Sequence, residues 1–293
     1  MTEVAITGFA SLDHVLALHG SPTPDATTIA RCGAWPRLGG SPSYVALALG
    51  SGDGLRAIPV SWIGDDAAGA DYLAAMHGAG LAVEGIERIA GGATPKTVMA
   101  YTPDGDCYCL HDPGCSTDAR LSEAQRAVVA RADWVCVTIG PAQAGADVLR
   151  SMRPDAHLVW VVKNDAASLQ PALMRALAER ARVISHSAQE AAFVEGVLGE
   201  VPRRDDCLVV QTLGARGAVA SWRGHGHAVS TQILDCRDPT GAGDSFVGGL
   251  VAALVRRPDD VAAALGAGIA AAYRLLESRE RPAASRGVFP PKS

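Results

Sequence analysis

The feature that most constrains the fold is an alternation, in the second half of the chain, of short apolar runs with longer segments of helical periodicity. Apolar runs rich in Val, Ile and Trp predict strands, and the periodic segments predict helices. The expected strands are residues 134–139, 158–162, 183–185 and 208–212, and the expected helices are 144–152, 169–180, 190–198, 246–255 and 261–276. Strands that alternate with helices pair in parallel and are covered on both faces. The pattern predicts an α/β fold of three layers, α/β/α, around a mainly parallel sheet.

The first half of the chain adds segments that do not fit this alternation. Its expected main-sheet elements are strands at 4–8 and 60–64 and helices at 41–49 and 66–77. Residues 96–110 alternate polar and apolar side chains around a Pro-Asp-Gly turn, which predicts a hairpin. Residues 21–36 predict loop with short extended pieces. We therefore expect a single domain over residues 1–293 with a small β-sheet lid, built from segments of about 13–36 and 94–112.

Charge and cysteine content argue against several classes of protein. The 293 residues carry a formal net charge of −5, so no nucleic-acid partner is expected. The seven cysteines include no CxxC pair and no zinc-like spacing, which favours reduced thiols in a cytoplasmic protein. No basic stretch precedes the first strand, so no signal peptide is expected. Charged residues and a proline at 256–260 interrupt the apolar stretch 251–273, so we expect no membrane-spanning segment and no membrane partner.

The strongest local motif is a glycine-rich turn at residues 238–246, which read DPTGAGDSF and lead into an expected helix. Small residues let the backbone approach a ligand, and the N–H groups at a helix start favour anions. The turn Gly241, Ala242 and Gly243 therefore predicts a phosphate-binding site. Asp244, beside it, is placed to accept a proton from an attacking hydroxyl group. The alternative is a turn in which Asp244 only caps the helix.

A second glycine-rich segment, residues 38–46, reads LGGSPSYVA and also opens an expected helix. Taken alone, it is equally well explained as an ordinary turn before a helix. Neither a GxxxxGK[ST] P-loop nor a GxGxxG motif after the first strand is present. The other common nucleotide-binding folds are therefore not simple explanations of the chain.

Together these motifs resemble those of the ribokinase-like (PfkB) family of carbohydrate and nucleoside kinases. The family pattern has an Asp, a run of small residues, a Gly and then the catalytic Asp, which falls here on Asp244. The resemblance implies that Gly241, Ala242 and Gly243 form the anion hole of a kinase. It further implies ATP as phosphoryl donor and Mg²⁺ as the accompanying cation.

The resemblance also assigns an acceptor-binding set. In the family, an Asp after the first strand binds substrate hydroxyl groups, and here that residue is Asp13, which otherwise caps a turn. The paired glycines of the second motif imply that Gly39, Gly40 and Ser41 line the acceptor site. Tyr44 stands where the family usually has an Asn that holds sugar hydroxyl groups, so we expect a modified acceptor-binding mode.

A nucleotide-binding set follows from residues 211–217, which read QTLGARG and resemble the family's nucleotide-binding strand and turn. The resemblance implies that Thr212, Gly214 and Gly217 lie near the phosphates or the ribose. The alternative is a strand that simply ends in a tight turn. Ser187 replaces the Asn of the family's Asn-x-x-Glu element and is expected near the nucleotide.

Two ion sites are implied by the same resemblance. Glu190 keeps the acidic position that in the family organises Mg²⁺ through water. The alternative is a capping box, because Ser187 precedes Glu190 by three residues at a helix start. Asp238, with the region of Ala284 and Ser285, corresponds to the family's monovalent-cation site, so K⁺ is a further expected cofactor.

The expected function is therefore transfer of the γ-phosphoryl group of ATP to a hydroxyl group of a sugar or nucleoside. The sequence has no cluster of basic residues near the expected site that could bind a second phosphate on the acceptor, so a sugar phosphate is not the expected acceptor. One alternative is a nucleoside-specific kinase, because Tyr44 and the aromatic residues Trp35 and Tyr101 of the expected lid offer faces for a base. Another is a non-catalytic ligand-binding member of the fold, suggested by the replaced Asn residues. A homodimer formed through the lid is the expected assembly.

Overall fold

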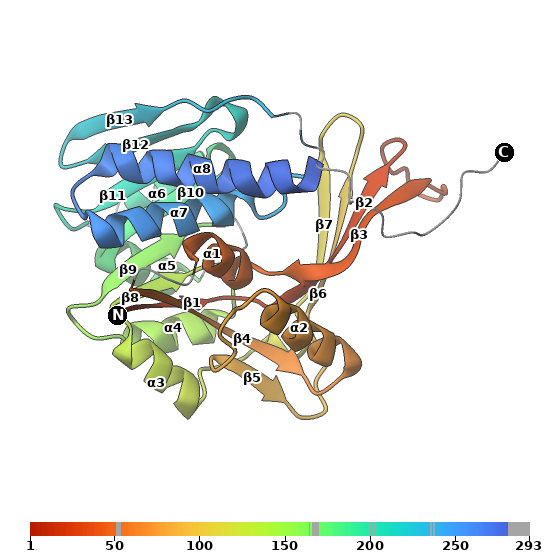
Figure 1. Ribbon diagram of the computed structural model, residues 1–293, viewed down its shortest axis with the longest axis horizontal. Helices are drawn as coiled ribbons and strands as arrows, with labels where there is room; N and C mark the ends of the chain where they lie inside the picture. The colour runs from red at the N-terminus through yellow and green to blue at the C-terminus, as the bar shows by residue number, and fades with distance from the viewer. Residues whose placement is uncertain are drawn as a thin grey trace.

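The computed structural model describes residues 1–50, 54–163, 165, 170–199, 201, 203–234, 236 and 238–280, without the side chains of 32–35 and 280. Within these residues, a large sheet has the strand order β13-β12-β11-β10-β9-β8-β1-β4-β5 (Figure 1). Its strands are β1 (Thr2–Thr7), β4 (Leu55–Gly64), β5 (Ile86–Ile89), β8 (Trp134–Val137), β9 (His157–Val161), β10 (Ala181–Ser187), β11 (Leu208–Thr212), β12 (Ala218–Trp222) and β13 (His225–Val229). In this order, the seven neighbouring strands β11, β10, β9, β8, β1, β4 and β5 pair in parallel, and β12 and β13 add an antiparallel edge.

Helices cover both faces of this sheet, as the alternation predicts. One core lies under α1 (Ser41–Leu49), α2 (Ala67–Gly78), α7 (Ala242–Arg256) and α8 (Val261–Glu280). The opposite core lies under α3 (Glu123–Arg131), α4 (Ala142–Ser151), α5 (Pro171–Arg180) and α6 (Ala191–Leu198). Short 3₁₀ turns are η1 (Gly114–Ser116), η2 (Ala188–Glu190) and η3 (Gly214–Arg216). Ligand sites of such folds lie beyond the carboxyl ends of the parallel strands.

A smaller sheet stands to one side of the main domain and forms the lid (Figure 1). Its order is β3-β2-β6-β7, with β2 (Ser11–Leu18), β3 (Ala30–Gly39), β6 (Lys96–Tyr101) and β7 (Cys107–Asp112). The predicted hairpin is present, because β6 and β7 are antiparallel and the turn is closed by a Thr102 N–H to Asp106 carbonyl bond of 2.9 Å. The first lid segment is more regular than expected, since β3 is a ten-residue strand rather than short extended pieces.

Helix α8 is long and apolar enough to meet the length and hydropathy of a membrane span, although no membrane-spanning segment is expected from the sequence. Residues 261–279 qualify by length and composition alone, with 28% of the window buried in the structure. Here the helix packs on α7, because Gly249 lies so close to it that an added Cβ would be 2.5 Å from the Ala267 carbonyl oxygen. Val261, Ala264 and Leu265 are buried in the core. Helix α8 is therefore part of the outer layer of the α/β domain.

Candidate active site

The turn before α7 leaves backbone N–H groups unpaired. Gly241 has a φ of 77°, a left-handed conformation that favours glycine, and it caps α7. The Ala242 N–H is used inside the turn, where it donates to a carbonyl at 3.0 Å, and the Ser245 N–H donates to the Gly241 carbonyl at 2.8 Å. Among the described backbone groups, the N–H groups of Gly243 and Asp244 have no such acceptor. They are the groups that an anion can bind.

Asp244 is buried next to this turn, with 7% of its surface exposed. Its Oδ1 atom is buried and accepts no hydrogen bond from any described residue. An unpartnered buried carboxylate oxygen is costly unless a ligand or water supplies a donor. Asp244 also lines a cleft of about 600 Å³ beneath the lid sheet, which we call the lid cleft. A molecule in the lid cleft therefore has access to this oxygen.

Most of the predicted acceptor residues meet in the lid cleft. The predicted residues that line it are Asp13, Gly40, Ser41, Tyr44, Gly241 and Asp244. Strands β6 and β7 add Thr97, Met99, Cys109 and His111. Gly39 lies behind the cleft wall, where an added Cβ would be 2.1 Å from the Asp13 carboxylate, so this glycine makes room for Asp13.

Asp13 and Tyr44 form a buried pair in the lid cleft. The Tyr44 hydroxyl donates to Asp13 Oδ2 at 2.8 Å, and both side chains are under 5% exposed. Burial raises the pKa of Asp13, although hydrogen bonds from Tyr44 and Ser11 and the charges of two arginines oppose the rise. Tyr44 therefore takes one oxygen of the carboxylate that the sequence predicts for acceptor hydroxyl groups. Its ring packs against Gly241, where an added Cβ would be 2.6 Å away.

A second cleft, of about 310 Å³, lies on the other side of the same turn, between the turn, α8 and the end of β11. We call it the helix cleft. It contains the predicted nucleotide residues Thr212, Gly214 and Gly217, and it reaches Ala242 and Gly243. Its other walls are mainly apolar and include Phe246, Ile269, Ala272, Tyr273 and Leu276. The glycine turn therefore separates two clefts, one lined by Asp244 and the other by Gly243.

Ser187 and Glu190 line neither cleft. The Glu190 carboxylate accepts a hydrogen bond from the Ser187 N–H at 2.7 Å, as the capping alternative requires. Ser187 is the last residue of β10 and pairs with Thr212 of β11, so it lies at the same sheet edge as the helix cleft. Within the described residues, no cluster of three metal-ligating side chains occurs. A lone carboxylate here fits a magnesium ion that is held mainly by phosphates and water.

Asp238 has other partners than the expected monovalent cation. Its carboxylate forms a bidentate ion pair with Arg37 of β3, and Arg279 of α8 donates to its main-chain carbonyl at 2.7 Å. The Arg279 Nη1 atom is also 3.4 Å from Asp238 Oδ1. Ala284 and Ser285, the other predicted cation-binding residues, lie outside the described residues. The oxygens of Asp238 are thus engaged by guanidinium groups and do not fit an added cation.

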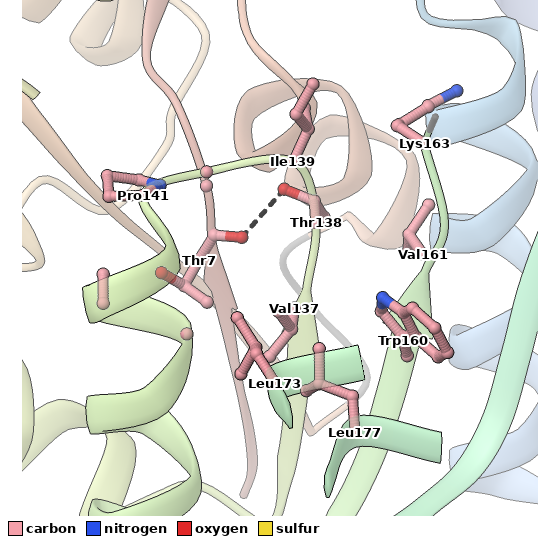
Figure 2. Close-up of a pocket in the computed structure, with 14 residues that line it drawn as sticks. Thr7, Val137, Thr138, Ile139, Pro141, Trp160, Val161, Lys163, Leu173 and Leu177 are labelled. Atoms are coloured by element: carbon pink, nitrogen blue, oxygen red, sulfur yellow. Dashed lines mark hydrogen bonds between the residues drawn. The ribbon is translucent and has the colours of Figure 1, made fainter. Parts of the chain in front are cut away.

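Sequence reasoning missed Lys163 and Asp165, which both line the lid cleft. Lys163 follows the carboxyl end of β9, and its Nζ atom is 3.8 Å from the position that a Cβ on Gly243 would occupy. Lys163 also lines a small pocket, in which it lies on the side away from Leu173 and Leu177 (Figure 2). In the same pocket the Thr138 hydroxyl donates to the Thr7 carbonyl. The sequence feature that could have identified Lys163 is its position directly after a strand of the parallel sheet, where functional residues of α/β folds gather.

Comparison with known proteins identifies the family of this chain. A family model described as pfkB family carbohydrate kinase matches residues 1–280. A fructokinase of Vibrio alginolyticus is 25% identical over 279 residues, which cover 88% of this chain and 86% of that protein. Fructokinase-1 of Oryza sativa subsp. japonica is 25% identical over 266 residues, with 82% and 81% covered.

Solved structures share the fold. The nucleoside kinase of Methanocaldococcus jannaschii, an archaeal member of the ribokinase family, superposes with a TM-score of 0.77 at 17% identity, over 94% of this chain and 92% of that one. A ribokinase of Cryptococcus neoformans var. grubii serotype A in complex with ADP gives 0.76 at 20% identity, over 94% of each chain. A Burkholderia thailandensis nucleoside kinase in complex with inosine gives 0.71 at 18%, over 92% and 89%. The predicted three-layer fold is confirmed, and because the family model spans nearly the whole described chain, the protein belongs to the pfkB family of carbohydrate kinases.

Proposed function

We propose that this protein transfers the γ-phosphoryl group of ATP to a hydroxyl group of a sugar or nucleoside, with Asp244 as the general base. The observation that carries the proposal is the unpartnered Oδ1 of Asp244, buried in the lid cleft beside unpaired backbone N–H groups. A hydroxyl group in the cleft that donates to Oδ1 supplies the missing hydrogen bond and is then the nucleophile.

The reaction follows from the two clefts. The acceptor hydroxyl gives its proton to Asp244 Oδ1, its oxygen forms a bond to the γ-phosphorus, and the bond from that phosphorus to the β–γ bridging oxygen breaks, so ADP leaves with the electron pair. The N–H groups of Gly243 and Asp244 hold the transferred group between the clefts. The Lys163 ammonium faces this position and offsets negative charge on it. Magnesium, when bound with the triphosphate, supplies further positive charge there.

The helix cleft suits the nucleotide. Its apolar walls from α7 and α8 offer a surface for a flat base, and we assign Thr212 and Gly214, at the end of β11, to the phosphates or the ribose. The Cryptococcus ribokinase was solved with ADP, which supports a nucleotide in the same fold. We assign Glu190 the role of holding magnesium through water, from the carboxyl end of β10, with Ser187 as its positioning partner.

Two acceptor classes remain in the proposal. Fructokinases among the relatives favour a simple sugar, and Asp13 is the carboxylate that would bind its hydroxyl groups. A nucleoside is the second candidate, because Phe9, Met99 and Ile139 give the lid cleft an apolar wall on which a base can lie. The Tyr44 ring is a poorer platform than the sequence suggests, since Gly241 packs against it.

The test is a panel of sugars and nucleosides offered to the purified protein with ATP. Acceptor-dependent release of ADP, with the phosphorylated product identified by mass spectrometry, is the expected result. The matched variants are Asp244→Asn and Asp259→Asn, since Asp259 is exposed beyond the far end of α7. Absence of acceptor-dependent ADP release across the panel, in protein shown to bind ADP, contradicts the proposed function.

A further inference from the structure

Two arginines from distant parts of the chain meet at Asp238, just before the glycine turn. Arg37 comes from lid strand β3, and its Nη2 atom donates to Asp238 Oδ1 at 3.2 Å, beside a second bond to Oδ2. Arg279 comes from the last turn of α8 and donates to the Asp238 carbonyl at 2.7 Å. All three side chains are largely buried, with 14 to 21% of each side chain exposed. Charged groups this far from water need partners, and these partners are protein groups.

Among the described residues, the charges around Asp238 balance without an ion. Burial opposes ionisation of Asp238, but the hydrogen bonds from Arg37 and Thr240 and the charges of both arginines outweigh it, and its pKa is lowered. The same two guanidinium groups also act on the buried Asp13 carboxylate. Two carboxylates therefore face two permanent cations. A further monovalent cation at this place would add positive charge, and the part of the chain that the structure describes leaves no carboxylate there to offset it.

The arginine pair is connected to the catalytic turn. Asp238 Oδ1 accepts the Thr240 N–H at 3.2 Å, and Thr240 directly precedes Gly241. The Thr240 hydroxyl is in turn 2.7 Å from the Tyr101 hydroxyl of lid strand β6. The groups that bind Asp238 thus also fix the position of Thr240, the residue that leads into the glycine turn. The N–H groups of this turn are the proposed site of the phosphoryl group.

We propose that Arg279, together with Arg37, takes the place of a monovalent cation beside Asp238, so that turnover needs no K⁺. This inference rests on the proposed kinase function for its effect on rate. A potassium ion binds through oxygen atoms, and here the carboxylate and carbonyl oxygens of Asp238 already accept guanidinium N–H groups. Arg279 is a positioning residue, because it acts on the turn through Asp238.

The test compares K⁺ with tetramethylammonium at equal ionic strength. The unmodified protein is expected to show the same kcat in both salts. Arg279→Ala is expected to lose about tenfold in kcat in tetramethylammonium, the scale of one charge-assisted hydrogen bond, and to recover activity in K⁺. Arg279→Lys, which keeps a cation, is expected to stay insensitive to K⁺. Arg274→Ala, on the exposed side of the same helix, is the control and should behave like the unmodified protein.

Melting temperatures give a second readout that does not need a known acceptor. K⁺ should raise the Tm of Arg279→Ala more than tetramethylammonium does, because an ion that binds only the folded state stabilises it, and it should have no such effect on the unmodified protein. Strong activation of the unmodified protein by K⁺, full activity of Arg279→Ala in tetramethylammonium, or a slow variant that K⁺ does not restore would each overturn the inference. Absence of any turnover would instead count against the kinase function, and the Tm comparison would still decide the role of Arg279.

Discussion

Asp13 meets two opposing demands at the scale of a single residue. Its carboxylate accepts hydrogen bonds from acceptor hydroxyl groups most strongly when it is ionised, yet burial raises its pKa. Because folding raises this pKa, the folded protein keeps a proton on Asp13 over a pH interval in which the unfolded chain has lost it. The loss of stability grows as the pH rises through that interval and is complete above the folded pKa. Above the folded pKa, the ionised Asp13 therefore costs stability.

Asp13→Asn tests this conflict. The amide keeps an oxygen for the Tyr44 hydroxyl but carries no charge, so we expect the Tm at pH 7.5 to be unchanged or higher than that of the unmodified protein. Acceptor KM should rise at least tenfold, about the loss of one hydrogen bond to a charged group, while ADP affinity stays the same. Thermal melts, kinetics and calorimetry measure the three quantities. A lower Tm with unchanged acceptor KM would show that Asp13 is structural.

Lys163 carries the second residue-scale prediction. Its ammonium faces Gly243 in the lid cleft, so Lys163→Met should lower kcat about 10- to 100-fold through lost charge stabilisation. Lys163→Arg should restore part of the loss. The control is Lys96→Met, because Lys96 is exposed at the start of β6. Equal kcat for Lys163→Met and Lys96→Met would remove Lys163 from the mechanism.

Site residues next to a recognisable motif could be predicted from the sequence, whereas others could not. Asp244 and Gly241 are contiguous, and their small neighbours give the motif away. The partners of Asp238 cannot be read in this way, because Arg37 is 201 positions from it and Arg279 is 41. Lys163 has no motif of its own, and only the sheet order brings β9 beside the turn.

At the scale of elements, the glycine turn and α7 form one unit, in which Gly241 and Gly243 have different structural roles. Gly241 adopts a φ of 77° against the Tyr44 ring, while Gly243 has open space up to the Lys163 Nζ at 3.8 Å. Gly241 is thus required by the fold of the turn. Gly243 is not required by the fold, and we expect that the absence of a side chain there leaves room for the phosphoryl group.

The pair Gly241→Ala and Gly243→Val should separate folding from catalysis. Gly241→Ala forces a side chain into a left-handed conformation, which costs about 1–2 kcal/mol, and into contact with Tyr44, so the Tm should fall. Gly243→Val should melt near the unmodified protein but lose kcat, because its side chain blocks the anion site. Denaturant unfolding and kcat are measured on both. The assignment is wrong if Gly243→Val turns over normally.

The same scale shows which elements the sequence predicts. Strands in the middle of the sheet stand out as apolar runs, because β8 is fully buried and β9 is buried apart from its first residue. Strand β5 at the sheet edge reads IERI and was not expected, because edge strands carry polar residues. Helix α3 was also missed, although its capping box Ser122 and Gln125 is visible in the sequence.

At the scale of the whole molecule, the lid has an exposed outer strand. Every residue of β7 is exposed, including Tyr108 at 45% and Leu110 at 67%. Exposed apolar side chains gathered on one element are typical of an interaction surface. The homodimer through the lid remains a prediction, as do the cytoplasmic location and the absence of nucleic-acid partners.

Light scattering after size exclusion should therefore give a mass of twice the 30.2 kDa chain. Leu110→Asp, which places a charge on the outer lid strand, should shift the mass toward one chain. The control is Leu47→Asp, because Leu47 is exposed on α1 away from the lid sheet. A monomeric unmodified protein, or a Leu110→Asp dimer as stable as the original, would exclude this interface.

The whole account depends on two clefts that share one turn, with Asp244 as the base between them. The most direct test is the ratio of kcat between the unmodified protein and Asp244→Asn on the acceptor found in the panel, with ADP affinity measured on both. The account predicts a fall of about 10²- to 10⁴-fold in kcat and unchanged ADP affinity, because the helix cleft is intact. A variant that keeps near-normal kcat would show that Asp244 is not the base and would contradict the central claim.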